Sequence, residues 1–173
     1  MKYAAEIKLR ALEPEDLELI YRIENHPDFV RWSAASAPYS RYIIRQYLET
    51  TTNNLFSDQQ VRLVIEQQNA DGEVISIGFA DLTNYSPQHQ RAEISLAILP
   101  EYQGNHAAEP AVRLLEEYAR RLRLHQLYAI IAHTNAPALR LFQRLGYEET
   151  ARLPQWIYDG NSYVEAHVFS QLL

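Results

Sequence analysis

One stretch of the sequence could bind an anion through its backbone. The segment Leu99-Pro-Glu-Tyr-Gln-Gly-Asn-His-Ala-Ala-Glu-Pro-Ala111 follows a β-type run and precedes a long amphipathic helical pattern. The first turn of a helix leaves backbone N–H groups without internal partners, and the helix dipole adds partial positive charge there. A strand–loop–helix turn with small residues therefore offers a seat for an anion, and we expect a phosphate.

The residue types and their spacing argue against cysteine, serine-nucleophile, nucleotide-binding and metal chemistry. The chain has no cysteine, which removes disulfides, thiolate catalysis and cysteine-ligated zinc. There is no Gly-x-Ser-x-Gly nucleophile turn and no Walker phosphate loop. We expect no metal site, because no tight ligand spacing occurs among the six histidines, which are His26, His89, His106, His125, His133 and His167.

Length and charge restrict the class of protein. The chain has 173 residues, of which 47% are apolar and 22% are charged, so we expect one globular domain over residues 1–173. No segment reaches the roughly 20 apolar residues that span a bilayer, so we expect a cytoplasmic protein without a membrane partner. The formal net charge of −6 disfavours nucleic-acid binding and mildly favours cationic partners.

Periodicity and turn residues predict the order of the elements. The Asp-Gly pair at 71–72 indicates a hairpin, while Asn135 and Gly146 are suited to cap the two ends of a helix. A loop is expected at 28–39. We expect strands at 6–12, 61–66, 73–82, 92–99, 127–132, 155–158 and 163–169, and helices from Pro14 to a break at 25–27 and at 40–51, 108–122 and 135–145.

The fold class that follows is α/β, with a mixed sheet of the α+β kind. The order is β-α-α-β-β-β-α-β-α-β-β, and a central, mostly antiparallel sheet is flanked by helices. Along 92–99, alternation places two sets of residues on opposite faces of a strand. One set is Ala92, Ile94, Leu96 and Ile98, and the other is Glu93, Ser95, Ala97 and Leu99.

This order and four local motifs resemble the GNAT superfamily of acyl-CoA-dependent N-acetyltransferases. The resemblance is closest to the branch that contains spermidine/diamine acetyltransferases and ribosomal-protein N-terminal acetyltransferases. It covers nearly the whole chain, with the motifs in family order and at family spacing. They are Leu9-Arg-Ala-Leu-Glu-Pro-Glu-Asp-Leu17, Arg91-Ala-Glu-Ile94, Pro100-Glu-Tyr-Gln-Gly104 and Asn135-Ala-Pro-Ala-Leu-Arg-Leu-Phe-Gln-Arg-Leu-Gly-Tyr147.

The resemblance implies a binding site for acetyl-CoA and direct transfer of the acetyl group to an amine, without a covalent enzyme intermediate. Ile98 and Leu99 would offer backbone partners to pantetheine where their strand splays from the next, and Asn135 and Phe142 would also contact the cofactor. Backbone N–H groups of one loop would wrap the pyrophosphate, and its residues are Gln103, Gly104, Asn105, His106, Ala107 and Ala108.

Three residues in or near this predicted site depart from the family pattern or complicate it. His106 stands where the family loop has its second glycine, so either the imidazole lies outside the seat, where it could contact a phosphate, or the cofactor site is weakened. Glu109 would repel a phosphate unless it points away. Phe142 replaces a tyrosine that protonates the departing thiolate in many relatives; it could pack against pantetheine or serve only the core.

Glu93 is the expected general base, because the resemblance implies that this carboxylate draws the amine proton through water. A salt bridge to Arg91 is the structural alternative. His89 and Tyr85 are weaker candidates for the same role.

The resemblance implies that the acceptor pocket is built by the loop between the first two helices and by the final hairpin. Aromatic rings beside carboxylates suit a cation or an amino-terminal peptide. Trp32 and Trp156 could equally be packing residues or part of a homodimer surface. The expected substrate-binding residues are Phe29, Trp32 and Tyr39, with Asp28, Arg31, Trp156 and Tyr158 nearby.

The sequence thus predicts an acetyl-CoA-dependent N-acetyltransferase. Its acceptor would be a primary amine on a small molecule, such as a polyamine or amino compound, or a protein N-terminus. The alternative is a catalytically impaired GNAT-fold protein that binds a ligand or a partner.

Overall fold

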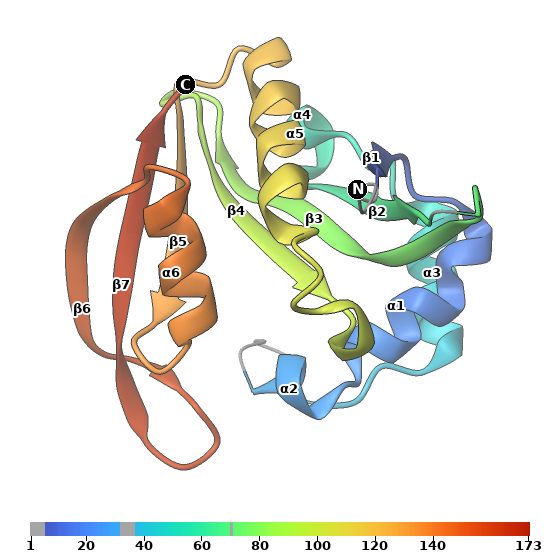
Figure 1. The fold of residues 1–173 in the computed structure, drawn as a ribbon, viewed down its shortest axis with the longest axis horizontal. Helices are drawn as coiled ribbons and strands as arrows, with labels where there is room; N and C mark the ends of the chain where they lie inside the picture. The colour runs from blue at the N-terminus through green and yellow to red at the C-terminus, as the bar shows by residue number, and fades with distance from the viewer. Residues whose placement is uncertain (1–5, 32–36, 70) are drawn as a thin grey trace.

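The computed structural model describes residues 6–31, 37–69 and 71–173. Its strands form a seven-stranded sheet in the order β1-β2-β3-β4-β5-β7-β6 (Figure 1). The strands are β1 Glu6–Arg10, β2 Val61–Gln68, β3 Val74–Ser86, β4 Arg91–Ile98, β5 Gln126–Ala132, β6 Glu148–Tyr158 and β7 Tyr163–Leu172. The helices are η1 Pro14–Asp16, α1 Leu17–Glu24, α2 Pro27–Val30, α3 Arg41–Thr50, α4 Leu55–Asp58, η2 Pro100–Tyr102, α5 Ala108–Arg121 and α6 Ala136–Arg144.

The sheet is antiparallel except where β4 meets β5. These two strands are parallel and joined through α5, but their ladder contains only the pairs Arg91–Gln126, Ala92–Leu127 and Glu93–Tyr128. Figure 1 shows β4 and β5 together near the C-terminus and diverging toward their other ends. β4 stays paired with β3 as far as Ile98, so its remaining length has an edge without a strand partner.

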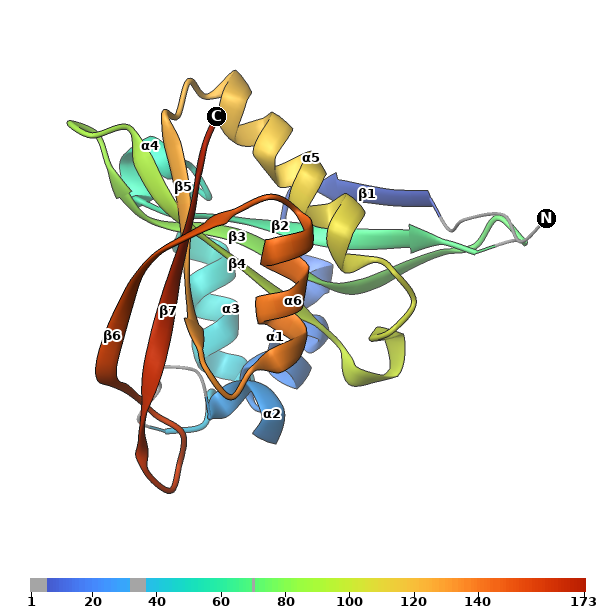
Figure 2. The same ribbon diagram turned by 60° about the vertical axis from the view of Figure 1, so that its left-hand side comes forward.

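Helices cover the two faces of the central strands (Figure 2). Ala92 and Ile94 of β4 lie in one core with the apolar face of α5, and Phe142 of α6 joins the same core. Val64 and Phe79 belong to a second core with α1 and α3 on the opposite face. The side chains of Glu93, Ser95 and Ala97 therefore lie on the α1 and α3 face, as strand alternation predicts.

The mixed fold is confirmed, and the two caps expected for α6 form, together with a cap at the start of α3 that was not predicted. Ser40 accepts a hydrogen bond from the Ile43 N–H at 3.2 Å at the start of α3, and Asn135 accepts one from the Ala138 N–H at 3.3 Å at the start of α6. Gly146 follows the end of α6 with φ of +89°, a backbone conformation that glycine adopts without a steric cost.

Some expected boundaries were wrong. The predicted loop at 28–39 contains most of α2, because Pro27 fits the first turn of a helix and the His26 ring caps it by accepting from the Asp28 N–H at 3.2 Å. The strand expected at 6–12 ends at Arg10. The short helix α4, which the sequence reading missed, begins where Asn54 accepts from the Phe56 N–H at 2.9 Å.

The last hairpin is longer than expected. β6 starts at Glu148 rather than at 155, and β7 continues to Leu172 rather than to 169. β6 is one of the two edge strands of the sheet, and its residues are mostly exposed. An outer strand without a buried face has no apolar alternation, and that is why the pattern failed to mark it.

Candidate functional site

The turn before α5 presents a run of unpaired backbone donors. Gly104 and His106 have φ of +79° and +59°, and Ala107, which caps the helix, has no side-chain acceptor to offer. Within the part of the chain that the structure describes, the N–H groups from Gly104 to Glu109 donate to no protein acceptor. Such a run of free N–H groups at a helix start fits the negative charges of a pyrophosphate.

His106 and Glu109 leave this turn open. His106 adopts the left-handed backbone conformation that glycine would adopt, and its side chain is exposed. The Glu109 carboxylate accepts a hydrogen bond from Arg144 Nε at 2.9 Å, so its charge is partly offset by a cation from α6. Neither departure therefore removes the run of free N–H groups from the turn.

The unpaired edge of β4 begins beside the turn. The Leu99 N–H donates to the Ile77 carbonyl at 2.9 Å, and the Leu99 carbonyl accepts from the Tyr102 N–H at 2.9 Å. Because alternate residues direct their backbone groups to opposite sides of a strand, those of Leu96 and Ile98 face the gap toward β5. The Ile98 carbonyl accepts from Gln103 Nε2 at 2.8 Å.

Of the two residues predicted to pair with pantetheine, Ile98 thus faces the gap, while both backbone groups of Leu99 have partners within the chain. Leu96 faces the gap as well, although the sequence analysis did not select it. The alternation along β4 was a signal that could have found it.

Asn135 immediately precedes α6, and Phe142 lies within that helix. The Asn135 side chain serves as the helix cap described above. Phe142 is 5% exposed, and its ring contacts Tyr147 edge-on with 4.9 Å between the centroids. Phe142 is therefore a core residue in this structure.

Glu93 occupies the point where the strands part. It is the last β4 residue paired with β5, opposite Tyr128, and its Oε2 accepts from Asn84 Nδ2 at 2.7 Å. No ion pair joins it to Arg91 among the described residues. Burial raises the pKa of Tyr128, and the charge of Glu93 raises it further. The carboxylate is thus held by one neutral donor and remains half-buried.

The two weaker alternatives to Glu93 lie elsewhere. Tyr85 is buried, and its hydroxyl donates to Gln90 Oε1 at 3.3 Å. His89 is exposed in the turn after β3. Neither is brought to the parting of β4 and β5 by the strand register.

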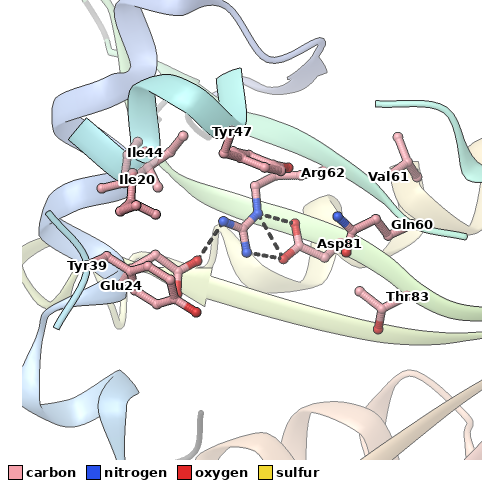
Figure 3. Close-up of a pocket in the computed structure, with 11 residues that line it drawn as sticks. Ile20, Glu24, Tyr39, Ile44, Tyr47, Gln60, Val61, Arg62, Asp81 and Thr83 are labelled. Carbon is pink, nitrogen blue, oxygen red and sulfur yellow. Dashed lines mark hydrogen bonds and ion pairs between the residues drawn. The ribbon is translucent and has the colours of Figure 1, made fainter. Parts of the chain in front are cut away.

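A cavity of about 370 Å³ lies between α1, α3 and strands β2 and β3 (Figure 3). Arg62 crosses it, donating to Glu24 at 2.6 Å and to Asp81 at 2.8 Å. Burial raises the pKa of the Asp81 carboxyl, although the Arg62 guanidinium opposes that rise. The lining residues are Ile20, Glu24, Tyr39, Ile43, Ile44, Tyr47, Gln60, Val61, Arg62, Asp81 and Thr83.

The charged residues of this cavity were not predicted from the sequence. Arg62 and Asp81 interrupt apolar strands, and they are cross-strand partners in the register. Two opposite charges inside β-rich runs can indicate a cross-strand ion pair. The pairing of β2 with β3 must be known, however, before Arg62 can be assigned to Asp81.

The expected acceptor residues are dispersed. Tyr39 lines the cavity and is 38% exposed, while Phe29 on α2 packs beside the core of α1 and α3. Trp32 lies outside the described residues. Trp156 and Tyr158, on β6, are 59% and 54% exposed.

Two further features of the described residues bear on function. They contain no helix that is both long and apolar enough to cross a membrane. Across the same ranges, no group of three metal-ligating side chains comes together.

A parallel strand pair that parts beside a turn of free N–H groups is the arrangement implied for acyl-CoA-dependent N-acetyltransferases. Comparison with protein families gives the same class, because residues 6–148 match the Acetyltransferase (GNAT) domain. The chain belongs to this family, and it is an acyltransferase that uses acetyl-CoA as donor.

Individual relatives in this family have named activities. Spermidine N(1)-acetyltransferase of Escherichia coli K12 is 29% identical over 96% of this chain and 86% of the relative. The crystal structure of spermidine N-acetyltransferase from Vibrio cholerae in complex with CoA and spermine has a TM-score of 0.81 and 26% identity, covering 96% and 95% of the two chains. A dodecameric structure of the Vibrio cholerae enzyme gives a TM-score of 0.79 at 26% identity, covering 96% and 93%.

Proposed function

We propose that this protein transfers the acetyl group of acetyl-CoA to a primary amine of a polyamine. The observation that carries the proposal is the acidic cavity on the α1 and α3 face. Thr83 lines that cavity and is the cross-strand partner of Glu93, so the cavity lies one strand away from the parting of β4 and β5. The relatives that act on spermidine support the same acceptor class.

The charges of the cavity favour a cation with more than one amine. Glu24 and Asp81 carry two negative charges, and Arg62 supplies one positive charge. Glu93 adds a further carboxylate beyond Thr83. This excess of negative charge attracts an acceptor that carries several ammonium groups, and the rings of Tyr39 and Tyr47 offer faces for its cationic centres.

The roles of the chain follow from this geometry. The N–H groups from Gly104 to Glu109 hold the pyrophosphate, and the open edge at Leu96 and Ile98 pairs with pantetheine. Acetyl-CoA supplies the activated acetyl group. Glu93 accepts a proton from the bound ammonium, directly or through a water molecule, which leaves the amine nucleophilic.

A catalytically impaired module is the second candidate, because Phe142 lacks a hydroxyl. The backbone of the turn argues against it. His106 adopts φ of +59°, so the donors remain arranged as a glycine would arrange them, and cofactor binding is expected to persist.

We also propose that the protein acts in the cytoplasm as a homo-oligomer. The dodecameric relative supports an assembly of copies. The homodimer expected from exposed aromatic residues fits the hairpin of β6 and β7, where Tyr163 is 67% exposed and its ring packs against Tyr158 at a tilt, with 5.2 Å between the centroids.

The test begins with calorimetric titration of acetyl-CoA, followed by a thiol-release assay over polyamines, amino acids and amino-terminal peptides. We expect micromolar to millimolar binding and release that depends on a polyamine. If neither heat of binding nor release of thiol is seen at millimolar acetyl-CoA, the proposed acetyltransferase activity is refuted. Release of thiol with peptides alone would assign a protein N-terminus as the acceptor.

Glu93→Gln tests the proposed base. We expect kcat to fall by roughly 100-fold, which is a common contribution of general-base catalysis, with the Kd for acetyl-CoA unchanged. Glu49→Gln is the matched control, because Glu49 is exposed on α3. Equal kcat values for Glu93→Gln and the wild-type protein would eliminate Glu93 as the base.

A further inference from the structure

Position 142, which supplies a proton to the leaving thiolate in many relatives, has no proton donor in this chain. Phe142 has no hydroxyl, and it is buried against Tyr147. Tyr147 is itself buried beside Glu116 of α5, whose charge adds to the burial that raises the Tyr147 pKa. The Tyr85 hydroxyl is bonded to Gln90. If the reaction uses a protein acid, another residue must provide it.

The place of the sulfur follows from the length of the open edge. Five residue steps separate Ile98, beside the pyrophosphate turn, from Glu93, where β4 rejoins β5. At about 3.3 Å per residue, this edge is roughly 16 Å long. A pantetheine chain extended along the edge from the turn therefore brings its sulfur toward the end of the ladder.

Tyr128 stands at that end of the gap. It is the last residue of β5 in register with β4, opposite Glu93. Leu127 and Ala129 belong to the core under α5, so strand alternation places the Tyr128 side chain on the opposite face, together with Glu93. Its hydroxyl takes part in no hydrogen bond within the described ranges, and the residue is half-buried.

We propose that the Tyr128 hydroxyl is the proton donor to the departing CoA sulfur, an inference that rests on the proposed function. The Tyr128 pKa lies above its ordinary value because of burial and the Glu93 charge. The phenol is therefore protonated before the reaction, so its proton is present when the thiolate forms.

The transfer balances with the residues named. The amine nitrogen forms a bond to the acetyl carbon, and the carbon–sulfur bond breaks with its electron pair remaining on sulfur. The sulfur takes the proton of Tyr128. Of the two protons that the ammonium nitrogen loses, one passes through Glu93 to the Tyr128 phenolate and the other goes to solvent.

The first experiment compares Tyr128→Phe with the wild-type enzyme in the polyamine assay. The substitution retains the ring, so folding is preserved. We expect kcat to fall about 100-fold, while the Kd for CoA remains unchanged. Tyr42→Phe is the matched control, because Tyr42 is 65% exposed on α3 and should retain wild-type kcat.

A second experiment measures the contact with sulfur without turnover. Calorimetry compares CoA with desulfo-CoA, which lacks the thiol. A hydrogen bond between Tyr128 and the thiol predicts that wild-type protein prefers CoA by about fivefold and that Tyr128→Phe loses this preference.

Unchanged kcat in Tyr128→Phe would overturn the proposal, as would an equal preference for CoA in both proteins. If wild-type protein acetylates no polyamine, the proposed function fails on its own, and the calorimetric comparison still decides whether Tyr128 meets the sulfur. Loss of both kcat and the thiol preference supports the assignment.

Discussion

Replacing His106 with glycine tests the conformation of the turn at 104–109, which we propose binds the pyrophosphate and call the pyrophosphate turn. His106 has φ of +59°, and a side chain in this left-handed region costs about 1 kcal/mol in the folded state. Glycine removes that cost, but it also gives the unfolded chain more freedom, which costs about 0.5 to 1 kcal/mol. The two effects nearly cancel, so we expect the free energy of unfolding to change by less than about 0.5 kcal/mol.

The effect on cofactor binding should also be small. The N–H groups of the turn already have the orientation that glycine would allow, and the His106 side chain is exposed. We expect the Kd for CoA to change by less than about threefold for His106→Gly, since no contact is removed and no obstruction is relieved. Isothermal calorimetry gives the Kd, and thermal unfolding should shift Tm by no more than about 2 °C for a chain of this size.

Gly104→Ala is the matched control for this prediction. Gly104 has φ of +79°, and a Cβ added there would meet no atom within 4 Å, so the cost of the substitution is purely conformational. We expect it to lose about 1 kcal/mol of stability. A tenfold tightening of CoA binding by His106→Gly would show that the imidazole obstructs the seat. A tenfold weakening would show that it holds a phosphate, and either result refutes the reasoning.

Two other substitutions give contrasting expectations. Arg62→Met should destabilise the protein by about 3 kcal/mol in denaturant unfolding, because it leaves the partly buried carboxylates of Glu24 and Asp81 without their cation. Arg144→Ala should barely change stability, since its pair with Glu109 is exposed. It should weaken CoA binding about two- to fivefold at low salt, because the uncompensated Glu109 charge then opposes the phosphates.

Controls for both substitutions lie in the same protein. Arg41→Met removes an exposed pair with Glu18 and the contact of the guanidinium with the Tyr21 ring, and it should destabilise the protein far less than Arg62→Met does. A loss of stability equal to that of Arg62→Met would contradict the role assigned to burial. For Arg144→Ala, the difference in Kd should shrink as salt is added. A difference that is independent of salt would exclude an electrostatic origin.

Local pattern predicts the fold where one face of an element is buried. The alternation along β4 and the apolar stripe of α5 located those elements within about a residue, because burial imposes a period of two or 3.6 on the sequence. The full length of β6 was not predicted because its residues are mostly exposed. The helices α2 and α4 were not predicted because each depends on one capping side chain, from His26 and Asn54, rather than on periodicity.

The candidate site divides in the same way. The pyrophosphate turn is continuous in sequence, so its donors could be assigned from one segment. The cavity around Arg62 is assembled from α1, α3, β2 and β3. Arg62 meets Asp81 through the register of β2 with β3, and it meets Glu24 only because α1 packs on the same face. The position of Tyr128 beside Glu93 likewise depends on a parallel pairing of strands joined through α5, and no local spacing encodes that pairing.

On the side of β4 opposite the gap, β4 lies close to β3 at one glycine. Gly78 of β3 is the cross-strand partner of Ile98, and a Cβ at this position would clash with the Ala97 carbonyl oxygen. β4 thus approaches β3 closely at Gly78, within the stretch where it has left β5. Only glycine permits this approach. Gly78 therefore permits the close approach of β4 to β3 opposite Ile98, at the edge proposed to pair with pantetheine, although it makes no contact with the cofactor in that arrangement.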